Sequence, residues 1–202
     1  QPIIPVTSTL DSHGHIAPNV LGITDTVFAL AWESIGDDHQ ILMRIYEEDG
    51  NPILGESVFS PYTDTAVDGI HRKPRMARLD GSTIAIAWID DWTDTPEDGP
   101  QSQVSGNFLS IPGGLSNPQD SIVISHTPEA QITHVDVIGL SPSRVLFVWS
   151  ELLPGESRIR FAERHRGATA CADPTNSTLT VDGTKVSVQK KWRRCVMADT
   201  EM

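Results

Sequence analysis

Apolar and polar residues alternate in several short segments of this chain, as they do in β-strands. In the segment 83–88, one face of a strand would carry Ile84, Ile86 and Trp88. The opposite face would carry Thr83 and two alanines, and such small side chains predict that a second sheet approaches closely there. No long segment keeps the helical period of about 3.6 residues, so the pattern predicts an all-β protein.

Three of these segments end near a tryptophan and form a repeat. They span residues 18–34, 74–90 and 135–151, and their tryptophans are 56 and 61 residues apart. Each copy contains a short strand, a turn and a second strand that ends at Trp32, Trp88 or Trp149. Repetition of this kind is typical of proteins built from stacked units, and it predicts that the three tryptophans lie in the core.

Further strands are expected after each tryptophan. The first copy also has a hairpin turn at 48–51, where Asp-Gly-type residues favour a tight turn. Four antiparallel strands per copy, buried on both faces, favour a blade of a β-propeller over a strand pair of a sandwich. The expected third strands are Gln40–Tyr46, Gln103–Ile111 and Arg158–Arg164, and the expected fourth strand of the first copy is Ile53–Phe59.

The repeat carries a motif, His-x-x-Pro … Leu … Asp-Gly … Ala-Trp … Arg … Asp-Gly-Asn-Pro … Gly, which resembles the β-propeller repeats of large secreted bacterial proteins. The resemblance covers residues 13–165 and implies a structural scaffold without an activity. The third copy keeps little of the motif beyond Trp149. The matching residues are His15, Pro18, Trp32, Arg44, Asp49, Gly50, Asn51, Pro52 and Gly55 in the first copy, and His71, Pro74, Leu79, Asp80, Gly81 and Trp88 in the second.

Three blades are too few to close a propeller, which typically has about four to eight. We therefore expect a partial or open propeller, which is part of a longer polypeptide, combines with other subunits, or stacks its sheets openly. The third copy has no evident fourth strand, and Ile3–Thr9 is a candidate to supply it. Such pairing would also cover a sheet edge that is otherwise prone to associate.

The repeat region is expected to span residues 1–167, and residues 168–202 form a different region. Residues 1–150 carry 20 acidic and 6 basic side chains, whereas residues 151–202 carry 7 acidic and 9 basic ones. Around Asp182-Gly183 we expect a β-hairpin. Cys171 and Cys195 flank this hairpin, and a disulfide between them would stabilise it by about 3 kcal/mol. Two free buried thiols are the alternative.

A secreted, extracellular location is expected from the cysteine pair together with the glycosylation sequon at Asn176. The apolar runs are only as long as strands, so no membrane-spanning segment is expected. The net charge of −12 argues against binding to nucleic acid, whose phosphates require a basic surface. It argues equally against adhesion to anionic lipid.

A basic cluster near the C-terminus is a candidate binding site. Its functional interpretation is docking to an acidic surface, such as the body of another copy, which would create a heterologous contact. Its alternative interpretation is a solvated edge strand that charge protects from aggregation. The cluster consists of Lys190, Lys191, Trp192, Arg193 and Arg194.

An acidic loop at 90–99 contains five carboxylates and is a candidate calcium site. The candidate ligands are Asp90, Asp91, Asp94 and Asp98, although the loop does not fit the spacing of an EF-hand and acidic surface loops are common in so acidic a chain. Trp92 and Trp192 lie outside the repeat, so each could stack on a sugar or anchor a partner, with core packing as the alternative.

Two histidines, His13 and His15, have a spacing that suits metal ligands on one strand face. However, His15 and His71 occupy the same repeat position, seventeen residues before Trp32 and Trp88. Repetition favours a structural role, such as a side chain that bonds backbone between blades.

No catalytic motif is evident, because the chain lacks a Gly-x-Ser-x-Gly elbow and a sialidase Asp-box. We therefore expect no enzyme, and no cofactor other than the candidate calcium ion. The expected function is a non-catalytic extracellular protein-interaction, adhesion or assembly module, whose partners are copies of itself or other extracellular proteins. A carbohydrate-binding, lectin-like propeller and a fragment of a glycosidase are the alternatives.

Overall fold

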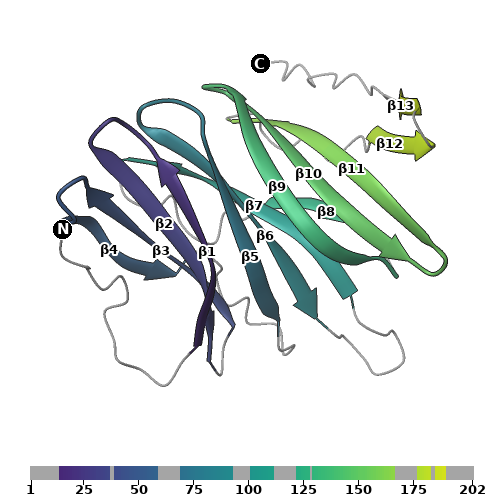
Figure 1. Ribbon diagram of the computed structural model, residues 1–202, viewed down its shortest axis with the longest axis horizontal. Coiled ribbons are helices and arrows are strands. Elements are labelled where there is room, and N and C mark those ends of the chain that lie inside the picture. The colour runs from purple at the N-terminus through teal and green to yellow at the C-terminus, as the bar shows by residue number, and fades with distance from the viewer. Residues whose placement is uncertain are drawn as a thin grey trace, which may run out of the picture.

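The computed structural model describes residues 14–36, 39–58, 69–92, 101–111, 122–127, 129–166, 177–182 and 185–189. Within these ranges the chain is all-β, contains no helix and forms three antiparallel sheets, as the sequence predicts (Figure 1). No helix in these ranges is long and apolar enough to cross a membrane.

Each sheet follows the chain order of its strands. Sheet 1 contains β1 (Gly14–Gly22), β2 (Val27–Ile35), β3 (Gln40–Glu47) and β4 (Pro52–Val58). Sheet 2 contains β5 (Ile70–Arg78), β6 (Thr83–Trp92), β7 (Gln101–Ser110) and β8 (Ile122–His126). Sheet 3 contains β9 (Gln131–Ser141), β10 (Arg144–Leu153) and β11 (Glu156–His165), followed by β12 (Ser177–Asp182) and β13 (Lys185–Gln189).

The fourth position of sheet 3 is occupied by β12. Its Leu179 lies opposite Ile159 of β11, and β13 then pairs with β12. Residues 3–9, which were expected to supply this strand, lie outside the described residues, and β12 pairs at the edge where that strand was expected.

The hairpin between β3 and β4 illustrates how local sequence sets a turn. Gly50 has a φ of 89°, a conformation that a residue without Cβ adopts at little cost. The carboxylate of Asp49 accepts hydrogen bonds from the backbone N–H of Asn51, at 2.9 Å, and from its side-chain amide, at 2.7 Å. The predicted hairpin turn at 48–51 is therefore confirmed.

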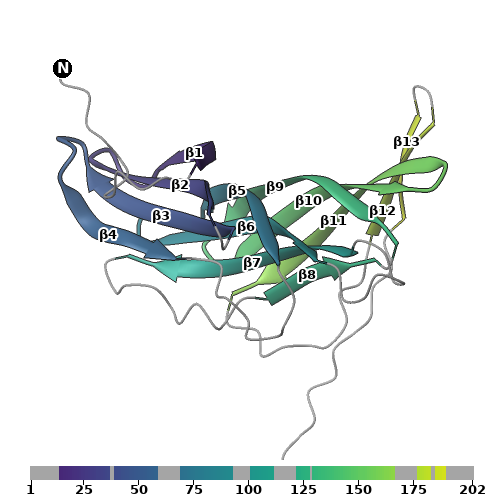
Figure 2. The ribbon, with the colours of Figure 1, turned by 90° about the horizontal axis from the view of Figure 1, so that it is seen from below.

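Sheet 2 lies between the other two sheets, and β6 is buried on both faces (Figures 1 and 2). Ile84, Ile86 and Trp88 point toward sheet 1, in one core cluster. Ala85 and Ala87 point toward sheet 3, in a second cluster. The predicted alternation in this strand is thus confirmed, and so is the close approach of a second sheet to the alanines.

The same packing occurs at both junctions between sheets. We call the face that carries the repeat tryptophan the tryptophan face of a sheet, and the opposite one its second face. Trp88 of sheet 2 packs in one cluster with Ala29 and Ala31, on the second face of sheet 1. Trp149 of sheet 3 packs in the other cluster with the equivalent alanines of sheet 2. Trp88 and Trp149 are 1% exposed and Trp32 is 4% exposed, so all three tryptophans are buried as predicted.

The first strands of the sheets contact one another, β5 with β1 and with β9. Gly139 of β9 lies so close to β5 that a Cβ atom in its place would overlap the carbonyl oxygen of Arg78. The close approach of these two strands therefore requires glycine at this position.

Candidate functional site

A β-bulge in the first strand of sheets 1 and 2 shapes the polar region where the sheets meet. The register shifts between Ile16 and Asn19 in β1 and between Arg72 and Arg75 in β5. Inside these bulges Ala17 and Lys73 have φ values of 51° and 56°, although neither is glycine. Such a conformation costs about 1–3 kcal/mol and persists only where the surroundings hold it.

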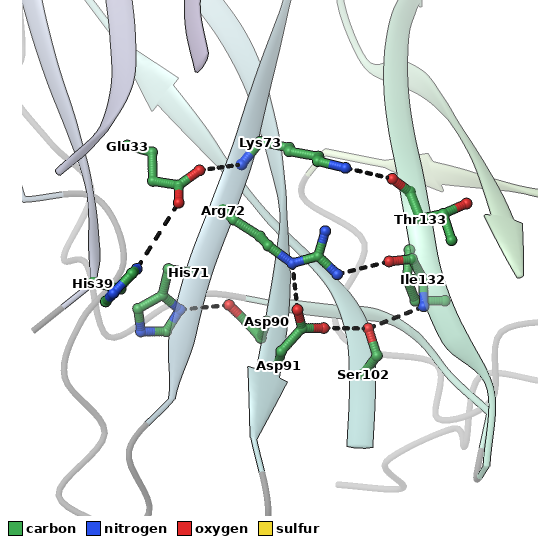
Figure 3. A network of polar contacts seen from close by, with 10 residues as sticks. All are labelled: Glu33, His39, His71, Arg72, Lys73, Asp90, Asp91, Ser102, Ile132 and Thr133. Atoms are coloured by element: carbon green, nitrogen blue, oxygen red, sulfur yellow. Dashed lines mark hydrogen bonds and ion pairs between the residues drawn. The ribbon is translucent and has the colours of Figure 1, made fainter. Parts of the chain in front are cut away.

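Lys73 joins all three sheets from its place in the bulge of β5 (Figure 3). Its backbone N–H donates to Oε2 of Glu33 in sheet 1, at 3.4 Å. Its Nζ donates to the carbonyl oxygen of Thr133 in sheet 3, at 2.9 Å. Oε1 of the same Glu33 lies 3.9 Å from Nδ1 of His39. A single residue of sheet 2 therefore contacts both neighbouring sheets.

Arg72, the preceding residue, binds sheet 3 through a closed set of contacts (Figure 3). Its Nη2 donates to the carbonyl oxygen of Ile132, at 2.8 Å, and its Nε forms an ion pair with Asp91. Asp91 in turn accepts from Oγ of Ser102, at 2.6 Å. That hydroxyl oxygen accepts from the backbone N–H of Ile132, at 3.1 Å. Both backbone groups of Ile132 are thus satisfied by side chains of sheet 2.

The repeat histidines make structural contacts within their own sheets. Nδ1 of His71 lies 2.5 Å from Oδ1 of Asp90, on the neighbouring strand of the same sheet. His15 instead packs edge-on against Trp32, with ring centroids 6.5 Å apart. These contacts agree with the structural role expected for the repeat histidines, and the side-chain bonds to backbone of a neighbouring sheet come from Arg72 and Lys73.

In sheet 3 a buried carboxylate occupies the position equivalent to Asp90, two residues after the repeat tryptophan. Glu151 is 0% exposed and accepts hydrogen bonds from Nε1 of Trp149, at 2.8 Å, and from Oγ1 of Thr127, at 2.9 Å. Its Oε2 lies 2.7 Å from Nε of Arg160. A buried charge needs this degree of compensation, because an unpaired carboxylate would be strongly destabilising.

Other basic side chains also cross the junctions between sheets. Arg78 of β5 donates to the carbonyl oxygen of Ile23, at 3.1 Å, and so reaches the sheet 1 side. Arg164 of β11 donates to the carbonyl oxygen of Ile124 in β8, at 3.0 Å. Burial lowers the pKa of Arg164 below its ordinary value. In both cases an arginine side chain donates a hydrogen bond to backbone on the other side of a junction between sheets.

The structure places the first residues of the candidate calcium loop in a strand. Asp90, Asp91 and the half-buried Trp92 belong to β6 rather than to a loop, because β6 continues to Trp92, opposite Gln101 of β7. Successive residues of a strand point to opposite faces, and the two carboxylates accordingly have different partners. The described residues contain no group of three or more His, Cys, Asp or Glu that could hold a metal ion. Asp94 and Asp98 lie outside the described ranges.

The remaining candidates from the sequence also fall on positions that the structure does not describe. They comprise the basic cluster, both cysteines, the sequon asparagine and one histidine. They are Lys190, Lys191, Trp192, Arg193, Arg194, Cys171, Cys195, Asn176 and His13.

Sequence reasoning did not identify the residues that make the polar contacts within and between the sheets. Two signals could have found them. Ala17 and Lys73 share a repeat position before proline, and Asp90 and Glu151 share a position after tryptophan. The acidic side chains of the site therefore face basic or hydroxyl groups of the same chain. Such an arrangement holds sheets in register.

Comparison with known proteins gives no relative: no protein-family model, no curated protein and no solved structure matches the chain.

Proposed function

We propose that this chain is a non-catalytic extracellular module for protein interaction and assembly, built on a partial β-propeller scaffold. The observation that carries the proposal is an exposed apolar surface on the outer side of sheet 3. Ile138 and Leu152 of this surface are 54% and 47% exposed. Large apolar side chains exposed on one sheet face are typical of sites where proteins associate.

The propeller interpretation is supported by how the sheets repeat. Four strands follow in chain order in sheets 1 and 2, and β12 adds a fourth to the meander of sheet 3. Tryptophan faces pack on second faces at both junctions, and the first strands of the sheets contact one another. Blades arranged around an axis have their first strands together in this way.

A scaffold role is supported by the contacts of the titratable groups. His71, Asp90 and Asp91 hold one another or neighbouring side chains, and Glu151 is enclosed by three partners. A general acid or base would have to reach a substrate atom at hydrogen-bond distance. These groups are directed at the chain itself.

The secreted location, the Cys171–Cys195 disulfide and glycosylation at Asn176 belong to this proposal and rest on the sequence alone. Mass spectrometry of the protein expressed through a secretory pathway tests them together. We expect an alkylating reagent to increase the mass only if the protein has first been treated with a reductant. A thiol that is alkylated without reductant would contradict the disulfide.

Light scattering over a range of protein concentrations tests the assembly function. We expect the average mass to rise with concentration above that of one chain, because burial of an exposed apolar surface lowers the free energy. A glycan array and a set of chromogenic glycosides serve as controls for the lectin and glycosidase alternatives. A chain that stays monomeric, or that cleaves a glycoside, would contradict the proposal.

A further inference from the structure

The outer face of sheet 3 is the second face of that sheet, which points away from sheet 2. Along β10 and β11 the residues of this face alternate with Phe147, Trp149 and Ala162 of the core. Ile138, Leu140, Leu152 and Ile159 are between 41% and 54% exposed. The apolar residues of the face are Ile138, Leu140, Leu146, Val148, Leu152, Ile159 and Phe161.

In the two preceding sheets the same face is covered within the chain. The second face of sheet 1 receives Trp88, and that of sheet 2 receives Trp149. Sheet 3 lies at one end of the stack, and no further described sheet covers it (Figures 1 and 2). An apolar sheet face in this position is suited to contact with another sheet.

The residues of this face differ in size from those that receive a tryptophan. Where sheets 1 and 2 have pairs of alanines, sheet 3 has Leu146 and Val148. Larger side chains keep a neighbouring sheet farther away. A tryptophan face therefore could not pack here at the spacing between sheets that is found at the two junctions inside the chain. Trp32, the repeat tryptophan of sheet 1, is in any case 4% exposed and already buried. A continuation of the stack by a second copy's tryptophan face is therefore disfavoured.

The low net charge of the face favours a second copy that meets it through the same face. In β9 to β11, with His134 and His165 counted as neutral, the charged residues of the face are Asp136, Arg144 and Glu163, and Nε of Arg144 lies 2.6 Å from Oε1 of Glu163. The net charge of this described part of the face is thus −1, in a chain whose net charge is −12. Two acidic copies repel each other least where they meet through a nearly neutral face.

We propose that the outer face of sheet 3 binds the same face of a second copy, so that two chains form a two-fold symmetric dimer. Two sheets that pack face to face in this way make an aligned sandwich with an apolar interior. A two-fold contact uses the same residues on both chains and closes, so it does not propagate into a filament. This inference rests on the proposed function and names its partner and its contact surface.

Sedimentation velocity of the whole chain over a concentration series, at low and at high salt, tests the dimer. We compare wild type with Ile138→Lys and Leu152→Lys, two exposed positions of the face. The matched control is Val20→Lys, which makes the same charge change at a 65% exposed position of sheet 1. We expect the dimer dissociation constant to rise at least about tenfold in both face variants and to be unchanged in the control.

The salt dependence separates this contact from one made by the basic cluster. An apolar contact between two acidic chains should be as strong or stronger at high salt, because salt screens their repulsion. Dissociation at high salt would indicate the basic cluster and would overturn the two-fold dimer.

The other outcomes separate the dimer from the assembly function. A larger assembly that Val20→Lys disrupts, or an oligomer that neither face variant weakens, would overturn the dimer and leave the assembly function standing. A wild-type chain that stays monomeric at every concentration would overturn both. Circular dichroism of each variant verifies the fold, and the two face variants are independent of each other.

Discussion

Nζ of Lys73 donates a hydrogen bond to the carbonyl oxygen of Thr133, 2.9 Å away, and thereby joins sheet 2 to sheet 3. The same residue holds Glu33 of sheet 1 through its backbone N–H. Its left-handed backbone conformation, with a φ of 56°, places these two donors toward opposite neighbours. Strain at one residue is thus retained where it serves contact between sheets.

Replacement of this lysine separates the effect of the side chain from that of the backbone. Lys73→Ala removes the bond to Thr133 and should lower the free energy of unfolding by about 1.5–3 kcal/mol, the range for hydrogen bonds of charged groups. Lys73→Gly removes the same bond but relieves the left-handed strain, so it should cost about 1 kcal/mol less than alanine. Urea denaturation measures both. A glycine variant less stable than the alanine variant would contradict the role of strain.

The buried ion pair of sheet 3 should be much more sensitive than an exposed one. Glu151→Gln leaves Arg160 without its charged partner inside the protein and should cost about 3–5 kcal/mol. The matched control is Glu163→Gln, which removes the partner of the exposed Arg144 and should have a much smaller effect, because solvent screens this pair. Guanidinium denaturation of the two variants checks the difference. Equal effects would show that burial does not decide the energy of these pairs.

The contact between β5 and β9 is tested at Gly139. Gly139→Ala places a Cβ atom against the carbonyl oxygen of Arg78, so the strands must separate. We expect a loss of about 1–3 kcal/mol or more, as for an overpacked core. Gly55→Ala is the control, because a Cβ atom there meets nothing within 4 Å, and its effect should stay within about 0.5 kcal/mol. Thermal unfolding of both variants checks this; an undisturbed Gly139→Ala protein would mean that the strands are farther apart.

The turn between β5 and β6 should respond to acid. The backbone N–H of Ser82 donates to Oδ1 of Asp80, at 2.8 Å, and this hydrogen bond lowers the pKa of Asp80 below its ordinary value. A carboxyl group with a lowered pKa in the folded protein stabilises it above the ordinary pKa of aspartate. That stabilisation is lost as the pH falls through the lowered value.

Asp80→Ala should therefore be less stable than wild type at neutral pH, and the difference should shrink below the ordinary pKa of aspartate. Asp80→Asn is the control, since its amide oxygen can still accept from Ser82 but does not titrate. Urea midpoints at neutral and acidic pH measure the differences. A difference that grows in acid would contradict the sign of the pKa change.

Much of the fold could be predicted because it depends on short-range patterns. The alternation in β6 and the Asp49–Asn51 turn are confirmed at their predicted positions. The bounds were less accurate, since β6 continues past Trp88 to Trp92 and takes in two aspartates that were expected in a loop. Polar residues at the end of a strand look like loop residues unless their partners are known.

The polar contacts between sheets could not be predicted. Lys73 occupies a repeat position before proline and Arg72 precedes it, but neither position shows that the side chain crosses to another sheet. Their partners lie 60 residues away in sequence for both Arg72 and Lys73. The repeat position of the left-handed residue is visible in the sequence, but its conformation follows from packing.

The sequence by itself determined that this protein is all-β, that three tryptophans lie in its core, and that β6 has two buried faces. These properties follow from the period of side chains along a strand, which is local. Only the tertiary structure decided which sheet each face meets, which charges are joined across the junctions, and which apolar face stays exposed. Those depend on the order in which sheets stack, and contacts between distant segments set that order.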